Sequence, residues 1–152
     1  MQKQKFYELL NQQAKGLIDG ERNHIANMAN LSALLFTNME DINWSGFYLM
    51  DGDNELVLGP FQGNPACIRI PVGKGVCGTA VSEAKTQLIE DVHAFEGHIA
   101  CDAASNSEIV IPVYKQGKVF AVLDIDSPSL ARFDEQDRLG LEALVKSFEE
   151  TL

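Results

Sequence analysis

The sequence has no apolar run that approaches the roughly 18 to 20 residues of a membrane-spanning helix. Its first residues, Met1 to Glu8, lack the apolar core of a signal peptide. Basic residues are scarce: 12 Lys and Arg stand against 22 Asp and Glu, which gives a net charge of -10. Because nucleic acids and anionic membranes attract basic proteins, this balance argues against both as partners. We therefore expect a cytoplasmic protein.

Cysteine is also scarce. The chain has three cysteines, an odd number, and no Cys-x-x-Cys pair. Structural disulfides are rare in a reducing compartment, which leaves reactive, metal-bound or buried thiols. The sequence shows no internal repeat, low-complexity segment or linker. At 152 residues with 45% apolar content, residues 1–152 are expected to form a single domain with a core of its own.

Hydrophobic periodicity predicts helices at both ends of the chain. The expected helices cover Lys3 to Ile18, a segment capped by Asn23 that runs to about Asn38, and a segment capped by Asp134 that runs to Leu152. The region between them is typical of strands, and these are predicted at 44–50, 55–58, 67–71, 86–89, 107–114 and 119–126, with a short helix over 76–84.

Two details of this central region depend on glycine, proline and alternation. Gly59 to Pro65 is rich in breakers and is interpreted as a loop. Over 67–71, alternation places Cys67 with Arg69 on one face and Ile68 with Ile70 on the other. The whole pattern predicts an α+β fold, with helices packed on a central antiparallel sheet and a long loop over a pocket.

The long loop, residues 90–106, holds the most reactive group of side chains. Loops longer than about 12 to 15 residues in a compact domain are usually functional or disordered. This one carries His93, His98 and Cys101. An imidazolium beside a thiol lowers the thiol pKa, so Cys101 is a candidate nucleophile. Cys67 and Cys77 are each either buried spectators or the second thiol that such chemistry needs.

Carboxylates interrupt the apolar runs that follow this loop. Glu108, Asp124 and Asp126 lie within or at the end of predicted strands, where an unpaired charge costs several kcal/mol. Asp124 and Asp126 are two residues apart and therefore share one face of a strand. Crowded like charges raise the pKa of one member, which predicts a carboxylic acid able to donate a proton.

Two other sites are compatible with parts of the pattern. Gly73-x-Gly75-x-x-Gly78 has the form of a dinucleotide-binding loop, but no long βαβ unit follows it, and the glycines are interpreted as allowing a tight turn. His93, His98 and Cys101 with one further cysteine would suit tetrahedral zinc. A zinc-binding protein would lose structure with a chelator.

Several longer motifs resemble one enzyme family. They are WSGFY at 44–48, GVCGTA at 75–80, DVH at 91–93, GHIACD at 97–102, SEIVIP at 107–112 and LDIDSP at 123–128. Together they closely resemble the free methionine-R-sulfoxide reductases, which are small enzymes built on a GAF domain. The resemblance covers nearly the whole chain and implies a single GAF domain over 1–152.

The resemblance implies a role for each candidate residue. Cys101 matches the nucleophile, and Cys67 and Cys77 match the cysteines of resolution and recycling, whose order stays open. The substrate would be bound by Glu108, Asp124 and Asp126, with Trp44 and Tyr48 as the wall that takes the methyl sulfoxide end. An acidic pocket pairs with the ammonium of a free amino acid, which a peptide-bound residue lacks.

The resemblance also implies partners. Thioredoxin is the expected external reductant, no cofactor or metal is expected, and the subunit number, including a homodimer, stays open. The alternative is a GAF module that senses a small molecule without turnover.

Overall fold

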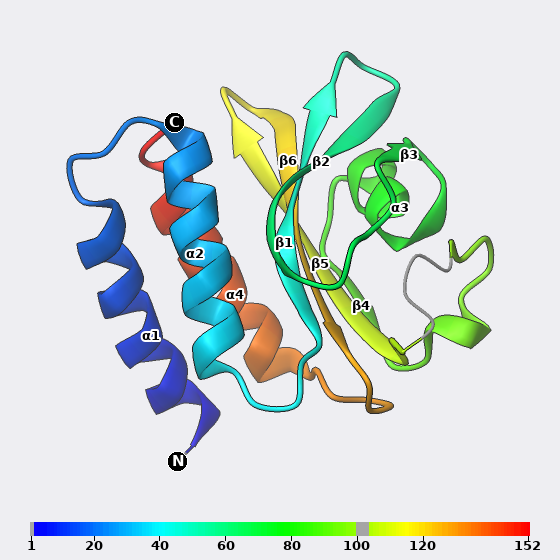
Figure 1. Ribbon diagram of the computed structural model, residues 1–152, viewed down its shortest axis with the longest axis horizontal. Helices are drawn as coiled ribbons and strands as arrows, with labels where there is room; N and C mark the ends of the chain where they lie inside the picture. The colour runs from blue at the N-terminus through cyan, green and yellow to red at the C-terminus, as the bar shows by residue number, and fades with distance from the viewer. Residues whose placement is uncertain (1, 100–103) are drawn as a thin grey trace.

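The computed structural model describes residues 2–99 and 104–152. Within these ranges a six-stranded sheet has the order β3-β2-β1-β6-β5-β4, and its neighbouring strands pair antiparallel. Figure 1 shows α1, α2 and α4 on one face of the sheet and α3 on the other. The bounds are α1 Lys3–Ile18, α2 His24–Asn38, β1 Trp44–Asp51, β2 Glu55–Gly63, β3 Arg69–Pro71, α3 Gly75–Glu83, β4 Gln87–Ile89, the 3-10 turn η1 Val92–Ala94, β5 Ser107–Lys115, β6 Lys118–Ser127 and α4 Glu135–Glu149.

The predicted α+β fold is confirmed. The helix caps are where the sequence places them: the Asn23 side chain accepts a hydrogen bond from the Ala26 amide, and Asp134 forms a capping box with Asp137. No helix in the described ranges is long and apolar enough to cross a bilayer.

The last helix ends earlier than predicted. α4 stops at Glu149, not at Leu152. The amides of Thr151 and Leu152 donate to carbonyls three residues back, at 2.9 and 3.1 Å, which is the tighter hydrogen bonding of a turn. Glu149 and Glu150 place negative charge at the negative end of the helix dipole, which opposes further helix.

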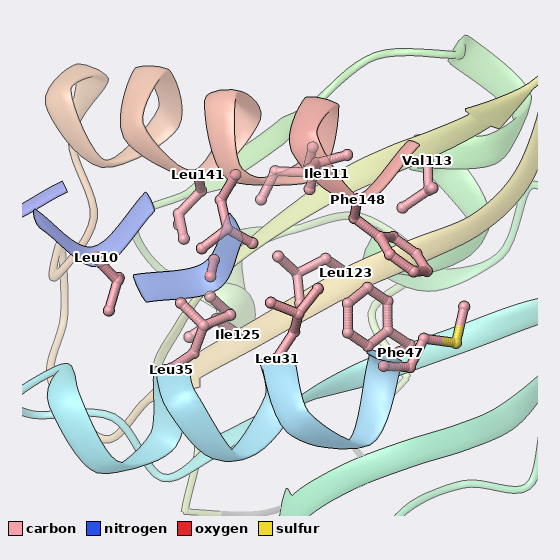
Figure 2. Close-up of a cluster of buried hydrophobic side chains, with 14 of the residues drawn as sticks. Leu10, Leu31, Leu35, Phe47, Ile111, Val113, Leu123, Ile125, Leu141 and Phe148 are labelled. Carbon is pink, nitrogen blue, oxygen red and sulfur yellow. The ribbon is translucent and has the colours of Figure 1, made fainter. Parts of the chain in front are cut away.

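The main core fills the space between the three large helices and one face of the sheet. Figure 2 shows side chains from α2 and α4 converging on those of β1, β5 and β6. Its fully buried members include Leu31, Leu35, Phe47, Leu123, Ile125, Leu141 and Phe148. The opposite face of the sheet carries a second, smaller cluster around Trp44, Tyr48 and α3, and this is the face on which the polar candidates gather.

The prediction of a loop at Gly59 to Pro65 is wrong, because β2 continues to Gly63. The pairing of β1 with β2 shifts register between Gly46 and Tyr48, so that Phe47 faces two residues of β2. Such a bulge tolerates Pro60, whose missing N–H is not needed by the ladder there. Gly46 is required as well, since an added Cβ would overlap Phe61.

The strand predicted at 67–71 is also shorter, and begins at Arg69. Ile68 and Ile70 do not share an environment, because Ile68 is 68% exposed and Ile70 is 5% exposed. Residues 64–68, which we call the strap, precede the strand, although Ile68 O still accepts a hydrogen bond from Leu58 N of β2 at 2.9 Å. They are held by two side chains of β1: Trp44 Nε1 donates to Asn64 O at 3.1 Å, and Tyr48 Oη donates to Cys67 O at 2.9 Å.

The contact between α1 and α4 gives a matched pair of glycine variants. Gly140 of α4 abuts Tyr7, and an added Cβ would overlap that ring, whereas nothing lies within 4 Å of a Cβ on Gly16 of α1. We expect Gly140→Ala to lower the free energy of unfolding by about 1–3 kcal/mol. Gly16→Ala should raise it by up to about 1 kcal/mol. Urea unfolding measures both, and equal shifts would contradict the packing argument.

Candidate functional site

A cavity opens on the α3 side of the sheet. It holds about 530 Å³ of space, including open solvent at its mouth. Six of the sequence candidates line it together, and so does His98. The lining residues are Trp44, Tyr48, Ala66, Ile70, Gly75, Val76, Cys77, His98, Ile99, Ser105, Glu108, Asp124 and Asp126.

The floor of the cavity is acidic. Glu108 comes from β5 and lies directly opposite Asp126 of β6, while Asp124 lies opposite Val110. We call Glu108, Asp124 and Asp126 the acid cluster. Their exposed fractions are 8%, 6% and 9%. Asp124 and Asp126 share one face of β6, as their spacing predicts, and antiparallel pairing adds Glu108 from the neighbouring strand.

Burial controls the protonation of this cluster. It raises the pKa of Glu108 well above its ordinary range, and the charge of Asp124 raises it further. Burial likewise raises the pKa of Asp124, with the charge of Asp126 as the next cause. Burial therefore favours neutral carboxylic acids at Glu108 and Asp124. The sequence analysis attributed the raised pKa to crowding of like charges. In the structure, loss of water on burial is the larger cause of the raised pKa.

Aromatic rings form one wall. Trp44 stacks with Phe61 and with Tyr48, with ring centroids 5.1 and 5.9 Å away and interplanar angles of 15° and 23°. Trp44 and Tyr48 are each 2% exposed. Burial, followed by the charge of Asp124, raises the pKa of Tyr48, so its phenol stays neutral and donates to the strap. Phe61, which stacks on Trp44, falls in the segment that the sequence analysis interpreted as a loop.

The three cysteines occupy different settings. Cys101 lies outside the described residues. Cys67, in the strap, is disulfide-bonded. Cys77 of α3 is a free thiol, 4% exposed, and its Sγ lies 3.5 Å from Asp124 Oδ2. Burial, reinforced by the acid cluster, raises the pKa of Cys77, so this thiol stays protonated and is a weak nucleophile.

The histidines lie at the edge of the cavity. His93 Nε2 is 3.0 Å from Asn106 Oδ1, which ties η1 to the end of the long loop. His98 lines the cavity, and burial lowers its pKa, with His93 as the smaller cause. In the described ranges the group that could hold a metal is Cys77, Glu108 and Asp124, and it contains neither histidine.

The glycine-rich turn serves packing. β3 and β4, which flank α3 in the sequence, lie at opposite edges of the sheet and form no parallel βαβ unit. A Cβ on Gly78 would overlap Pro71 O, so glycine lets α3 approach β3 closely. Gly75 has φ +63 and lies against Ile99. The turn therefore brings Cys77 to the acid cluster.

Ser105 is a cavity residue that the sequence analysis missed. It is 7% exposed and accepts a hydrogen bond from Asn43 Nδ2 at 3.3 Å. The backbone N–H of Asn43 donates to the backbone carbonyl of Asp126 at 2.9 Å. A serine in an irregular loop carries no sequence signal that distinguishes it from an exposed one.

The chain matches a known protein family. Residues 26–150 match the GAF domain family. The free methionine-R-sulfoxide reductase of Escherichia coli K12 is 55% identical over 152 residues, which are 100% of this chain and 92% of that protein. The chain belongs to the GAF-domain free methionine-R-sulfoxide reductases.

Solved structures agree with this assignment. The fRMsr of Staphylococcus aureus in complex with substrate is 58% identical, with a TM-score of 0.92 over 96% of this chain and 95% of that one. The free methionine-R-sulfoxide reductase of Neisseria meningitidis in complex with its substrate is 43% identical, with a TM-score of 0.95 over 99% and 90%. The family consists of oxidoreductases, and the resemblance stated from the motifs is confirmed.

Proposed function

We propose that this protein reduces free methionine-R-sulfoxide to methionine. The observation that carries the proposal is a buried acid cluster facing an aromatic wall, in a chain 55% identical to a reductase named for that reaction. The ammonium of the amino acid is placed against the acid cluster. The methyl sulfoxide end is placed against Trp44 and Tyr48.

The acid cluster explains why the substrate should be a free amino acid. A peptide-bound or acylated methionine sulfoxide lacks the ammonium, so it would leave buried carboxyl groups without a partner. A site that binds a polar group rejects the analogue lacking it, because desolvation of the unpaired group is not recovered. An ammonium would also favour ionisation of the nearest carboxyl, while another member of the cluster keeps its proton.

In the proposed reaction, two thiols are oxidised to a disulfide while one sulfoxide is reduced to a thioether. The Cys101 thiolate attacks the sulfoxide sulfur while a neutral carboxyl, Glu108 or Asp124, donates a proton to the oxygen. Methionine leaves and the oxygen stays on Cys101 as a sulfenic acid. A second thiol then displaces that oxygen as water and forms a disulfide. Thioredoxin, a dithiol, reduces this bond and becomes oxidised.

We propose Cys67 as the second thiol. Cys67 is disulfide-bonded whereas Cys77 carries a free thiol. Burial raises the pKa of Cys77, which lowers the thiolate fraction that an attack on a sulfenic acid needs. Cys77 is therefore left out of the disulfide exchange in this proposal.

A coupled assay tests the function. Thioredoxin, its reductase and NADPH are mixed with the protein and with free methionine-R-sulfoxide, the S epimer or N-acetylmethionine-R-sulfoxide. We expect NADPH oxidation with the free R epimer, and at least about 100-fold lower kcat/KM with the acylated one, since a buried polar site left unpaired can discriminate by up to about 10⁴- to 10⁵-fold. Binding of the sulfoxide without methionine release would favour the sensing module.

The strap gives a second prediction, about disulfide formation. Tyr48→Phe keeps the aromatic wall and deletes the hydrogen bond to Cys67 O. Losing a bond worth about 1 kcal/mol should lower the equilibrium constant for the Cys67 disulfide against glutathione by roughly 5-fold. Tyr114→Phe is the matched control, because Tyr114 Oη donates to the Ala84 carbonyl at 2.7 Å, away from the strap. Equal redox equilibria for Tyr48→Phe and the unmodified protein would exclude this role.

A further inference from the structure

Cys77 has no part in the proposed disulfide exchange, yet its thiol points at the acid cluster. The ligand atoms of Cys77, Glu108 and Asp124 lie within 4.8 Å of one another, and all three residues are buried. They come from three elements, α3, β5 and β6, so rigid secondary structure holds the group together. One soft sulfur and two hard oxygens in one buried group are the donors of a borderline metal ion.

The spacing of these atoms suits tetrahedral coordination. Bonds of about 2.3 Å to sulfur and about 2.0 Å to oxygen at tetrahedral angles put sulfur and oxygen roughly 3.5 Å apart. Cys77 Sγ and Asp124 Oδ2 are 3.5 Å apart. Within the described residues, Asp124 Oδ1 is buried and accepts no hydrogen bond, although its side chain lines the cavity. An uncompensated acceptor at the same place is a second indication that a cation belongs there.

We propose that the reduced protein binds one thiophilic divalent cation, of the Zn²⁺ or Cd²⁺ type, through Cys77, Glu108 and Asp124. The cation replaces the thiol proton, which passes to solvent. Three protein ligands leave a fourth position open toward the cavity. This ion is an inhibitor, because it occupies the acid cluster that the proposed function assigns to the substrate ammonium. Cation and free amino acid should therefore exclude each other.

Sulfur sets the selectivity of the site. Mg²⁺ and Ca²⁺ prefer a shell made of oxygen ligands alone, so a buried thiolate disfavours them. A plain acidic cluster would show the opposite preference or none. Selectivity for Cd²⁺ over Mg²⁺ thus distinguishes a cysteine-containing site from general attraction to a protein of net charge -10.

The experiment uses Cys67→Ser/Cys101→Ser, in which Cys77 is the one remaining thiol. Cd²⁺ titration should give an ultraviolet thiolate-to-metal absorption that saturates at one equivalent, and a roughly 100-fold excess of Mg²⁺ should leave it unchanged. Adding Glu108→Gln, which keeps the thiol, should weaken Cd²⁺ binding by at least about 10-fold. His93→Gln should leave it intact. Free methionine should compete with Cd²⁺ and N-acetylmethionine should not.

The unmodified, reduced protein provides a second measurement. Its single tryptophan, Trp44, lines the cavity and reports on binding by fluorescence. Zn²⁺ should raise the KM for the sulfoxide without lowering kcat. In the Cys67→Ser/Cys101→Ser background, an absorption that survives Cys77→Ser, an undiminished affinity in Glu108→Gln, or displacement by Mg²⁺ would each overturn the inference. The absorption and fluorescence readouts need no turnover, so failure of the proposed function would show separately, as absent methionine production.

Discussion

Cys101→Ser should lower kcat for methionine formation by at least about 10³-fold, because removing a nucleophile leaves only the contribution of binding and polarisation. The loss should appear in a single turnover without reductant, where the unmodified protein releases one equivalent of methionine. Serine at this position cannot form the sulfenic acid through which the oxygen leaves the substrate. Chromatographic quantification of methionine at short times gives the measurement.

The other two cysteines supply matched controls of the same substitution. Cys67→Ser should still release one equivalent of methionine in a single turnover, yet should lose thioredoxin-supported cycling, and dithiothreitol should restore part of it. Cys77→Ser should keep cycling within about 10-fold, since a buried protonated thiol contributes little nucleophile. Undiminished turnover in Cys101→Ser would remove the nucleophile assignment. Loss of cycling in Cys77→Ser with retention in Cys67→Ser would reverse the order of the resolving thiols.

The parts of the fold that the sequence predicts are those fixed by local pattern. Amphipathic spacing and cap residues locate α1, α2 and the start of α4. Alternation and apolar runs locate β5 and β6. The extension of β2 to Gly63 could not be predicted from the sequence, because it depends on a bulge opposite Phe47. Pro60 fits in a strand only at a position where the partner strand does not accept a hydrogen bond from that residue's N–H. Whether such a position exists depends on how β1 pairs with β2, and the sequence of residues 59–65 alone does not show it.

The candidate site, like the fold, has parts that the sequence predicts and parts that depend on tertiary contacts. The spacing of Asp124 and Asp126 places both on one face, which the structure confirms. Cys77 and Asp124 are 47 positions apart in the sequence. Their contact depends on the close approach of α3 to β3, which Gly78 allows. The strap could not be foreseen either, because alternation alone predicts a strand through Ile68. Its course follows from hydrogen bonds donated by the side chains of Trp44 and Tyr48.

Asp124→Asn should separate activity from stability. An amide cannot donate a carboxylic proton to the sulfoxide oxygen, and loss of general acid catalysis costs about 10²- to 10⁴-fold in rate. The same change should stabilise the substrate-free protein at pH 8 by about 0.5–2 kcal/mol, the range common for single stabilising substitutions. The amide has the size of the carboxyl and carries no charge to bury. Coupled assays and urea unfolding measure the two effects.

The pH dependence of stability gives this prediction its sharpest form. Folding raises the pKa of Asp124, chiefly through burial, so the folded state holds a proton that the unfolded chain releases at an ordinary carboxyl pKa. The stabilisation is therefore complete below the ordinary range and is lost as pH rises toward the folded pKa. Asp124→Asn should flatten that decline. Asp53→Asn is the control, because the Asp53 side chain is 80% exposed and forms an ion pair with Lys118 at the surface. This change should leave both the slope of stability against pH and the rate of methionine formation unchanged. A slope in Asp124→Asn as steep as in the unmodified protein would show that Asp124 is already ionised in the empty cavity, and the proton for the sulfoxide oxygen would then have to come from Glu108.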